Sequence, residues 1–279
     1  MKDLYAVIGD PIAHSMSPIM HNHLFQFYGV DAHYHAFKVE TENLKAAING
    51  FKAIGIAGFN VTVPHKMKII PFLDEIDPLA REIGAVNTVV NRDGKFIGYN
   101  TDGSGYLKGL SSVYDIQKDL SVLLIGAGGA ARGIYFTMAQ SGVEHIDITN
   151  RTVEKAEQLI EECPYAVQSN AVPLKEAEAD LSQYDLVIQT TSIGMSPYMD
   201  RSPISLQNLC SNAFVSDIIY NPLTTKILHQ AKEKGAKIQN GLDMFVFQGA
   251  LAFEKWTGIF PDTDRMKNTV LTQLGGIQC

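Results

Sequence analysis

Residues 121–133 read SVLLIGAGGAARG, a run of apolar residues that leads through a glycine-rich turn into a helix-like segment. The turn, Gly126-Ala127-Gly128-Gly129-Ala130-Ala131, has the spacing G-x-G-x-x-A. In that spacing the first glycine makes a tight turn, the second lets the backbone approach a pyrophosphate, and the small last residue lets helix and strand pack closely. The helix N-terminus adds a partial positive charge. The stretch therefore predicts a strand–turn–helix unit that binds a dinucleotide. A tight turn that serves packing alone is the alternative.

The tip of the next expected strand distinguishes NAD from NADP. The segment HIDITNRT ends on Asn150, Arg151 and Thr152, and Lys155 follows one helical turn later. NAD sites usually carry an acidic residue at this tip for the ribose 2′-hydroxyl, and Asp147 comes three residues too early. A guanidinium pairs with a 2′-phosphate that a carboxylate would repel. The tip therefore favours NADP, and a solvated helix start is the alternative for its two basic residues.

Strands and helices alternate along the rest of the chain. Apolar runs such as LYAVIG and AGFNVTVP are separated by helix-like segments such as SPIMHNHLFQFYG, where we expect Ser17 as the N-cap and Gly29 at the C-terminal end. This alternation predicts an α/β fold with two domains. We place an N-terminal open α/β domain at 1–103 and a Rossmann-like dinucleotide-binding domain at 104–240.

Polar side chains follow the strand expected in GFNVTVPHK, residues 58–66. Strand alternation puts Asn60 and Thr62 on one face and an apolar set that includes Val63 on the other. Pro64 has no N–H for the ladder, and Lys66 comes just after it. Because open α/β sheets bind ligands outside the carboxyl ends of their strands, this segment is a candidate site. A surface lysine is the alternative for Lys66.

The segment VNTVVNRDGKFIGYNTD predicts a hairpin about Asp93-Gly94. Folding it there places Asn87 opposite Asn100 and puts Asp102, which would close the second strand before a glycine-rich crossing, at the same open end. Ordinary turn and edge chemistry is the alternative for these polar residues. Both Lys66 and Asp102 are then expected near a cleft between the two domains.

Two serines precede the first expected helix. Ser15 and Ser17 lie two residues apart in HSMSP, just before the helix N-terminus. Hydroxyls at a helix N-terminus form a plausible cradle for a carboxylate. Simple capping by Ser17 is the alternative.

Composition narrows the class of partner. The chain has 279 residues, a net charge of −7 and three scattered cysteines without a CxxC motif. It has no basic cluster for nucleic acid, no apolar run that approaches a membrane span, and no set of histidines with metal-ligand spacing. We therefore expect a small-molecule substrate, no nucleic-acid or membrane partner, no metal, and a cytoplasmic location. A monomer and a homodimer both stay open.

Taken together, the motifs resemble the shikimate dehydrogenase family. The matching stretches cover nearly the whole chain and come in the family's order: GDPIAHSMSP, GFNVTVPHK, GAVNTVV, GYNTDGSG, GAGGAAR, NRT, TTSIGM, DIIYNPLTT and GLDMFVFQGA. The resemblance implies that residues 1–103 form a substrate domain, that 104–240 bind NADP(H), and that helices in 241–279 return to the first domain. It implies reversible NADPH-dependent reduction of 3-dehydroshikimate to shikimate, a step of aromatic amino acid biosynthesis.

The resemblance also implies roles for individual residues. Lys66 and Asp102 would be the catalytic acid/base pair. The substrate's carboxylate and ring hydroxyls would be held by Ser15, Ser17, Asn60, Thr62, Asn87, Tyr220 and Gln248. The pyrophosphate, the 2′-phosphate and the nicotinamide would be lined by Gly126, Ala127, Gly128, Gly129, Ala130, Asn150, Arg151, Thr152, Lys155, Thr190, Thr191, Ser192, Ile218, Gly241 and Met244.

Two other functions stay open at this point. A quinate/shikimate dehydrogenase with broader cofactor use would differ in the pocket around Ser15, Ser17 and Tyr220. A non-catalytic NADPH-binding sensor on the same fold would need no acid/base pair, so the presence of both Lys66 and Asp102 disfavours it.

Overall fold

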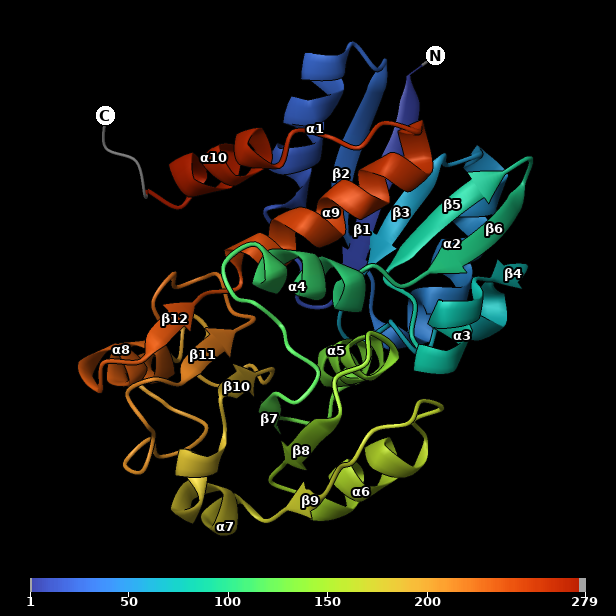
Figure 1. The fold of residues 1–279 in the computed structure, drawn as a ribbon. Coiled ribbons are helices and arrows are strands. Elements are labelled where there is room, and N and C mark those ends of the chain that lie inside the picture. Colours follow the sequence, from blue (N-terminus) through green and yellow to red (C-terminus); the bar gives the residue numbers. More distant parts are fainter. Residues whose placement is uncertain (1, 276–279) are drawn as a thin grey trace. The chain divides into compact units, whose positions relative to one another are not determined.

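The computed structural model describes residues 2–275, which form two units (Figure 1). One unit holds the chain up to Thr101 and from Val246 on, and the other is Asp102–Phe245. Helix α9 (Leu242–Thr257) carries the chain from the second unit back to the first. Each unit is built on its own sheet.

The first unit has a mixed sheet with strand order β2-β1-β3-β5-β6-β4. Its strands are β1 (Asp3–Gly9), β2 (Ala32–Lys38), β3 (Gly58–Val61), β4 (Glu75–Ile76), β5 (Thr88–Arg92) and β6 (Lys95–Tyr99). Strands β2, β1 and β3 are parallel, whereas β5 runs antiparallel to both β3 and β6. The alternation of strands and helices therefore gives parallel pairing at β1–β3, and the hairpin reverses the direction beyond it.

The predicted hairpin is confirmed. Arg92 pairs with Lys95 across a two-residue turn in which Asp93 has φ 52° and Gly94 has φ 84°. Positive φ at both positions is what a type I′ turn requires, and Asp-Gly supplies it. The register sets Thr88 opposite Tyr99, so the residues one step further out, Asn87 and Asn100, face each other as predicted.

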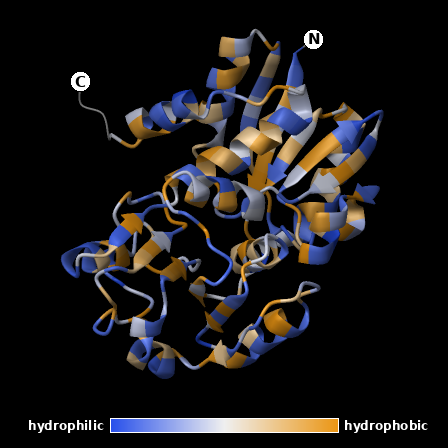
Figure 2. Cartoon of the chain, viewed as in Figure 1, coloured by the Kyte–Doolittle hydropathy of each residue, from blue (hydrophilic) through white to orange (hydrophobic). Residues whose placement is uncertain are grey.

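Helices cover both faces of this sheet. They are α1 (Ser17–Tyr28), α2 (Leu44–Ile54), α3 (Pro78–Ile83), α9 and α10 (Thr263–Gln273), with 3-10 turns at Thr41–Asn43 and Ile70–Phe72. Successive residues of β1 show the two faces: Tyr5 packs on Trp256 of α9, whereas Ala6 belongs to the core cluster that contains Ile48 of α2. Figure 2 shows both hydrophobic and hydrophilic residues on the helices, and in an amphipathic helix the hydrophobic ones, three or four residues apart, face the core.

The start of α1 differs from the prediction. The helix begins at Ser17, and its N-cap is Met16, which makes no side-chain cap bond. Instead the Ser17 N–H donates to Ser15 Oγ at 3.3 Å. The expected N-cap at Ser17 is therefore wrong by one residue, because the Met16 carbonyl already accepts the first helical hydrogen bond, from the Met20 N–H at 3.2 Å. Gly29 ends the helix with φ 67°, as predicted.

The second unit has an all-parallel sheet with strand order β12-β11-β10-β7-β8-β9. Its strands are β7 (Ser121–Ile125), β8 (His145–Thr149), β9 (Ala171–Val172), β10 (Leu186–Gln189), β11 (Phe214–Asp217) and β12 (Lys237–Gln239). Its helices are α4 (Asp102–Ser111), α5 (Gly129–Gln140), α6 (Val153–Glu161), α7 (Leu174–Ala179) and α8 (Lys226–Glu233), with a 3-10 turn at Leu181–Gln183. This order is that of the Rossmann fold. The predicted fold class, two α/β domains of which one is Rossmann-like, is confirmed.

The expected glycine-rich crossing after the hairpin is a helix, α4, so the prediction that Asp102 ends a strand is wrong. A Cβ on Gly103 would collide with Thr137 Oγ1 and the Gly133 carbonyl of α5. The glycines thus let α4 and α5 approach closely, and this packing overrides the poor helix propensity of glycine. Among the described helices, none combines the length and apolar character that a membrane span requires.

Candidate functional site

A buried hydrogen-bond network in the first unit contains two of the predicted substrate residues. The Tyr34 hydroxyl donates to Asn60 Oδ1 at 2.7 Å, and Asn60 Nδ2 donates to the Asn87 carbonyl and to Thr88 Oγ1, each at 3.1 Å. Tyr34 and Asn60 are 1% and 7% exposed. Because both ends of the Asn60 amide are engaged inside the protein, its orientation is fixed by the first unit itself.

Asn87 continues this network at the open end of the hairpin. Its Nδ2 donates to Thr101 Oγ1 at 2.9 Å, and its Oδ1 accepts from the Thr101 N–H at 2.8 Å. Asn100, on the opposite strand, donates to the Ala85 carbonyl at 2.9 Å. Two of the polar residues predicted at this end, Asn87 and Asn100, are thus hydrogen-bonded to backbone groups of the first unit.

The two predicted carboxylate-binding serines lie at the N-terminus of α1. Ser17 is buried and Ser15 half-buried. The Tyr34 phenol stands between this helix end and Asn60: burial raises the Tyr34 pKa well above its usual value, and a hydrogen bond with Ser17 opposes that rise. One buried tyrosine therefore connects two predicted substrate-binding groups.

The segment that carries Lys66 is anchored on both sides. The Thr62 N–H donates to the Ile8 carbonyl at 2.9 Å, the buried His65 ring contacts the Val39 carbonyl at 2.6 Å, and the Val86 N–H donates to the Lys66 carbonyl at 2.8 Å. These bonds fix the backbone on which the half-buried Lys66 side chain is mounted.

The alternation expected beyond Val61 is not observed. Strand β3 ends at that residue, so Thr62 lies outside the strand and Val63 is 63% exposed instead of joining the apolar face. The prediction that Thr62 shares a strand face with Asn60 is wrong for this reason. Two residues, Thr62 and Val63, lie between the end of the strand and Pro64.

The remaining predicted residues for substrate and catalysis lie on helices and a loop. Gln248, half-buried on α9, belongs to the first unit. Asp102, 4% exposed, is the first residue of α4 in the second unit. Tyr220 follows β11 in the second unit, and its ring stacks on Phe245 with centroids 4.5 Å apart.

The glycine turn of the second unit suits a pyrophosphate. Gly126 has φ +114°, and a Cβ there would lie 2.6 Å from Thr190 Oγ1, so only glycine fits. A Cβ on Gly128 or Gly129 would meet nothing within 4 Å, which leaves the approach to the loop open. Gly128 is the N-cap of α5 and no side chain caps the helix, so its first N–H groups can serve an anion. The flanking Ala127 and Ala130 are half-buried.

The tip of β8 fits a 2′-phosphate. Arg151 and Lys155 are exposed there, and Thr152 occupies the N-cap of α6 without a side-chain cap bond. Asn150 Nδ2 donates to the Thr152 carbonyl at 2.7 Å and so shapes the turn. Asp147, the nearest carboxylate before the tip, is hydrogen-bonded to the Tyr184 hydroxyl at 2.9 Å. The charge that this tip presents is therefore positive.

The predicted nicotinamide residues follow the strands of the same sheet. Thr190 Oγ1 donates to the Ile125 carbonyl at 2.7 Å, and Gly241 donates its N–H to the Ile219 carbonyl at 2.9 Å. A Cβ on Gly241 would overlap the Ile218 carbonyl, so this close approach also requires glycine. The other residues of this set are Thr191 and Met244, both half-buried, and Ser192, which is exposed.

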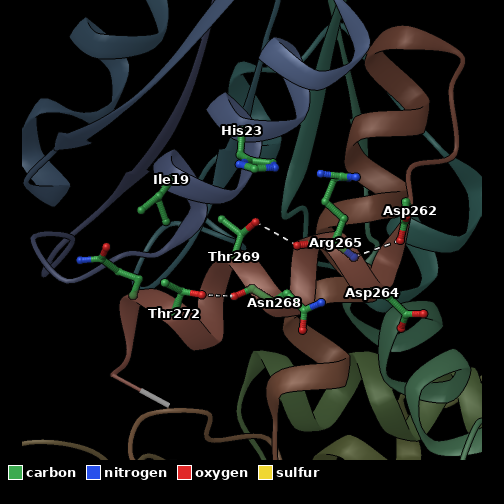
Figure 3. A pocket seen from close by; sticks show the side chains of 9 residues that line it. Ile19, His23, Asp262, Asp264, Arg265, Asn268, Thr269 and Thr272 are labelled. Carbon is green, nitrogen blue, oxygen red and sulfur yellow. Dashed lines mark hydrogen bonds between the residues drawn. The ribbon is translucent and has the colours of Figure 1, made fainter. Parts of the chain in front are cut away.

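A groove of about 550 Å³ in the first unit holds none of the predicted residues (Figure 3). It runs between α1, which contributes Ile19 and His23, and α10, which contributes Arg265. The Arg265 guanidinium lies 3.8 Å from the centre of the Phe27 ring. The groove therefore shows no sign of the predicted chemistry. Among the described residues, no cluster of three or more His, Cys, Asp or Glu could hold a metal ion.

Three network residues were missed from the sequence: Tyr34, Thr88 and Thr101. Thr88 and Thr101 stand inside quoted motifs, next to Asn87 and Asn100, so their position in those motifs was the available signal. For Tyr34 the signal was strand alternation, because its two histidine neighbours in β2 are exposed and it is buried.

Three family models match successive parts of the chain. They are described as the shikimate dehydrogenase substrate binding domain (residues 7–89), shikimate/quinate 5-dehydrogenase (residues 111–218) and the shikimate 5′-dehydrogenase C-terminal domain (residues 241–271).

Full-length relatives agree with these matches. A shikimate dehydrogenase (NADP(+)) of Bacillus cereus strain AH187 is 57% identical over 277 residues, which is 99% of this chain and 100% of the relative. A crystal structure of shikimate dehydrogenase in complex with NADP+ is 44% identical and has a TM-score of 0.92, over 98% of this chain and 96% of that chain. Shikimate 5-dehydrogenase from Thermus thermophilus, in complex with NADP(H) and shikimate, is 35% identical with a TM-score of 0.88, over 97% and 99% of the two chains.

Proposed function

The chain belongs to the shikimate dehydrogenase (NADP+) family, and we infer from this membership that it catalyses the reversible NADPH-dependent reduction of 3-dehydroshikimate to shikimate. The reaction is a step of aromatic amino acid biosynthesis, and NADP(H) is the cofactor. The observation that carries this conclusion is the 57% identity to a shikimate dehydrogenase (NADP(+)) over essentially the whole of both chains.

The substrate and the cofactor are assigned to different units. We assign the substrate to the first unit, which holds the network from Tyr34 to Asn87, and the cofactor to the second, which holds the glycine turn at Gly126. Helices α9 and α10 belong to the substrate unit from Val246 on. The proposed domains, 1–103 with 241–279 and 104–240, end within five residues of the boundaries of these units at Thr101 and Phe245.

The cofactor-binding residues act through shape and charge. The open side of Gly128 and Gly129 would admit the pyrophosphate to the N-terminus of α5. Arg151 and Lys155 would pair with the 2′-phosphate, which selects NADPH over NADH. When bound, NADPH supplies the hydride for carbonyl reduction.

The substrate residues hold and orient the ring. Ser15 and Ser17 would donate hydroxyl hydrogen bonds to the carboxylate at the positive end of α1. Thr62 and Gln248 would bind ring hydroxyls, and Asn60 and Asn87 would fix the walls between them. Tyr220 would contact the substrate near its carboxylate.

Lys66 and Asp102 are the acid/base pair of this proposal. Negative charge develops on the carbonyl oxygen during reduction. The Lys66 ammonium would stabilise that charge and hand over a proton; in the reverse reaction the amine would accept one. The Asp102 carboxylate would orient the ammonium and the reacting hydroxyl.

One assay tests the function. Nicotinamide absorbance is followed with shikimate and with quinate, each with NADP+ and with NAD+, and the four values of kcat/KM are compared. We expect shikimate with NADP+ to give the highest value by at least about tenfold, the effect of one good charge-assisted contact. Equal values for quinate would identify the broader quinate/shikimate enzyme. Tight NADPH binding without turnover of either acid would identify the sensor.

A further inference from the structure

We propose that Asp217 is a positioning residue that holds the loop 218–225, and with it Tyr220, in the conformation that receives the substrate. The proposal rests on the proposed function, because that function places Tyr220 against the substrate. It concerns a carboxyl group to which the proposed function gives no role in binding or in proton transfer.

The Asp217 carboxyl ties together the two ends of this loop. Asp217 is the last residue of β11 and is 1% exposed. Its Oδ1 accepts from the Ile219 N–H at 3.0 Å, at the start of the loop, and its Oδ2 accepts from Thr225 Oγ1 at 2.6 Å, at the end. Thr225 is the N-cap of α8, but its hydroxyl makes no cap bond to that helix and bonds Asp217 instead. One carboxylate therefore fixes the distance between the strand end and the next helix.

Other bonds hold the loop between Ile219 and Leu223 and do not reach Thr225. Gly241 donates its N–H to the Ile219 carbonyl, and Asn240 Nδ2 donates to the Leu223 carbonyl, each at 2.9 Å. The Ser196 N–H donates to the Asn221 carbonyl at 3.2 Å. These contacts hold the backbone between Ile219 and Leu223. The separation between the end of β11 and Thr225 depends on the Asp217 carboxyl.

The surroundings of Asp217 make this link sensitive to pH. Burial raises the pKa of the carboxyl to about 7, against the opposing effects of its bonds to Thr225 and Ile219. Above pH 7 the carboxylate can accept both hydrogen bonds. Below pH 7 the protonated oxygen becomes a donor, so the Thr225 hydroxyl must turn to accept from it, and the bond loses the strength that an ionised acceptor gives. The loop should therefore be held more loosely as the pH falls through 7.

Neighbouring ionisable groups do not replace this link. Tyr106 of α4 faces the carboxyl; burial raises its pKa and the Asp217 charge adds to the rise, so the phenol stays neutral. On α8, Lys226 is exposed and donates to the Asp200 carbonyl at 2.9 Å. On α9, Asp243 accepts from Gln239 at 3.3 Å.

The first test is Asp217→Asn, which keeps the shape of the carboxyl group and imitates its protonated form. In the unchanged protein we expect KM for shikimate to rise about fivefold between pH 8 and pH 6. In the variant KM should stay at the high value at every pH, with KM for NADP+ within about twofold of normal; these factors correspond to part of one charged hydrogen bond. Asp185→Asn is the matched control, since Asp185 also accepts one backbone N–H, from Ser121 at 3.1 Å, at the opposite end of the sheet. It should leave the pH profile unchanged.

A second pair of variants guards against misfolding. Thr225→Val removes the hydroxyl donor and should raise KM for shikimate as Asp217→Asn does. Thr225→Ser keeps the hydroxyl and should keep KM for shikimate at its normal value. A normal KM in Asp217→Asn, a surviving pH dependence of KM in that variant, or failure of Thr225→Ser to keep KM normal would overturn the proposal.

Hydrogen exchange separates this inference from the proposed function. The amides of 218–225 should exchange faster at pH 6 than at pH 8, after correction for intrinsic rates, and Asp217→Asn should exchange equally fast at both. This measurement needs no substrate. Exchange that is fast in Asp217→Asn at both pH values, and fast in the unchanged protein only at pH 6, supports the role of Asp217 even if shikimate is not turned over. Equal protection of these amides in both proteins at both pH values refutes it.

Discussion

The Tyr34 hydroxyl donates a 2.7 Å hydrogen bond to Asn60 Oδ1, and the two residues lie on strands that do not touch. Strand β1 separates β2, which carries Tyr34, from β3, which carries Asn60. The bond therefore reaches across a strand within the buried face of the sheet. On the backbone side, Asn22 of α1 accepts from the Tyr34 N–H and donates to the Tyr34 carbonyl, both at 2.9 Å. Tyr34 is thus held firmly enough to orient the amide.

Removal of that hydroxyl should weaken substrate binding. Tyr34→Phe leaves Asn60 Oδ1 buried without its donor, which costs about 1–3 kcal/mol of stability. Because the Asn60 amide can then turn, we expect KM for shikimate to rise about five- to tenfold, with KM for NADP+ unchanged. Steady-state kinetics and thermal unfolding measure the two effects. Tyr135→Phe is the control: it removes a bond to Ser169 in the other unit and should lower stability without changing KM for shikimate. An equal rise in KM in both variants would contradict the role of Tyr34.

The side chain of Lys66 should matter for turnover and not for cofactor binding. Loss of a positioned general acid typically costs on the order of 10²–10⁴ in rate, so Lys66→Ala should lower kcat by that range. Its affinity for NADPH, measured by fluorescence titration, should stay near normal. Lys68→Ala removes an exposed lysine two residues further on, which bonds Thr41 at 3.3 Å, and should leave kcat unchanged. Near-normal turnover in Lys66→Ala would remove this residue from the mechanism.

Arg151 should distinguish the two dinucleotides. Arg151→Ala removes an exposed guanidinium from the tip of β8, and we expect KM for NADPH to rise about tenfold, since a charged hydrogen bond contributes about 1.5–3 kcal/mol before solvent screening reduces it. Turnover and KM for NADH should stay the same. Arg201→Ala, at another exposed site of the same unit, is the control. The idea fails if NADH is affected as strongly as NADPH.

Local chemistry made much of the fold predictable. Asp93-Gly94 needs only its own φ preferences to specify the hairpin, and the turn at Gly126 follows from its spacing within a strand–turn–helix unit. The predictions failed where distant packing decides. Asp102 starts a helix because Gly103 packs against α5, and Val63 is exposed because β3 stops at Val61.

The family resemblance proposes the site residue by residue, but it does not give the internal bonding. It implies that Asn60 and Asn87 belong to one pocket, whereas the bond from Tyr34 to Asn60 depends on the strand order β2-β1-β3. Periodicity gives the face of a residue and not the order of the strands, so a contact across β1 has no local signal. The hydrogen bond between Thr225 and Asp217 likewise has no local signal in the sequence, because it depends on the path of a loop.

His21 gives a prediction for the dependence of stability on pH. Its ring is fully buried, stacks on Tyr34 at 4.6 Å, and has no hydrogen-bond partner at either nitrogen among the described residues. Burial lowers the pKa of His21 from 6.5 to about 3. Between these two values the unfolded chain binds a proton that the folded chain does not. The contribution of the neutral His21 ring to the free energy of unfolding is therefore fully present above pH 6.5. It decreases as the pH falls from 6.5 toward 3, because the unfolded chain gains a proton there. At pH 5 the loss is about 2 kcal/mol, from 1.36 kcal/mol per pKa unit.

His21→Phe should remove this loss, because a phenyl ring can stack in the same place and takes up no proton. The free energy of unfolding, from urea titrations at pH 7 and pH 5, should shift in favour of the variant by about 2 kcal/mol between the two pH values. Comparison with the unchanged protein cancels the other titrating groups. His229→Gln is the control, since the His229 side chain on α8 is 68% exposed and lies 3.6 Å from Glu233; its difference from the unchanged protein should vary much less with pH. A difference for His21→Phe that is the same at pH 7 and pH 5 would mean that the buried ring is protonated as easily in the folded chain as in the unfolded one.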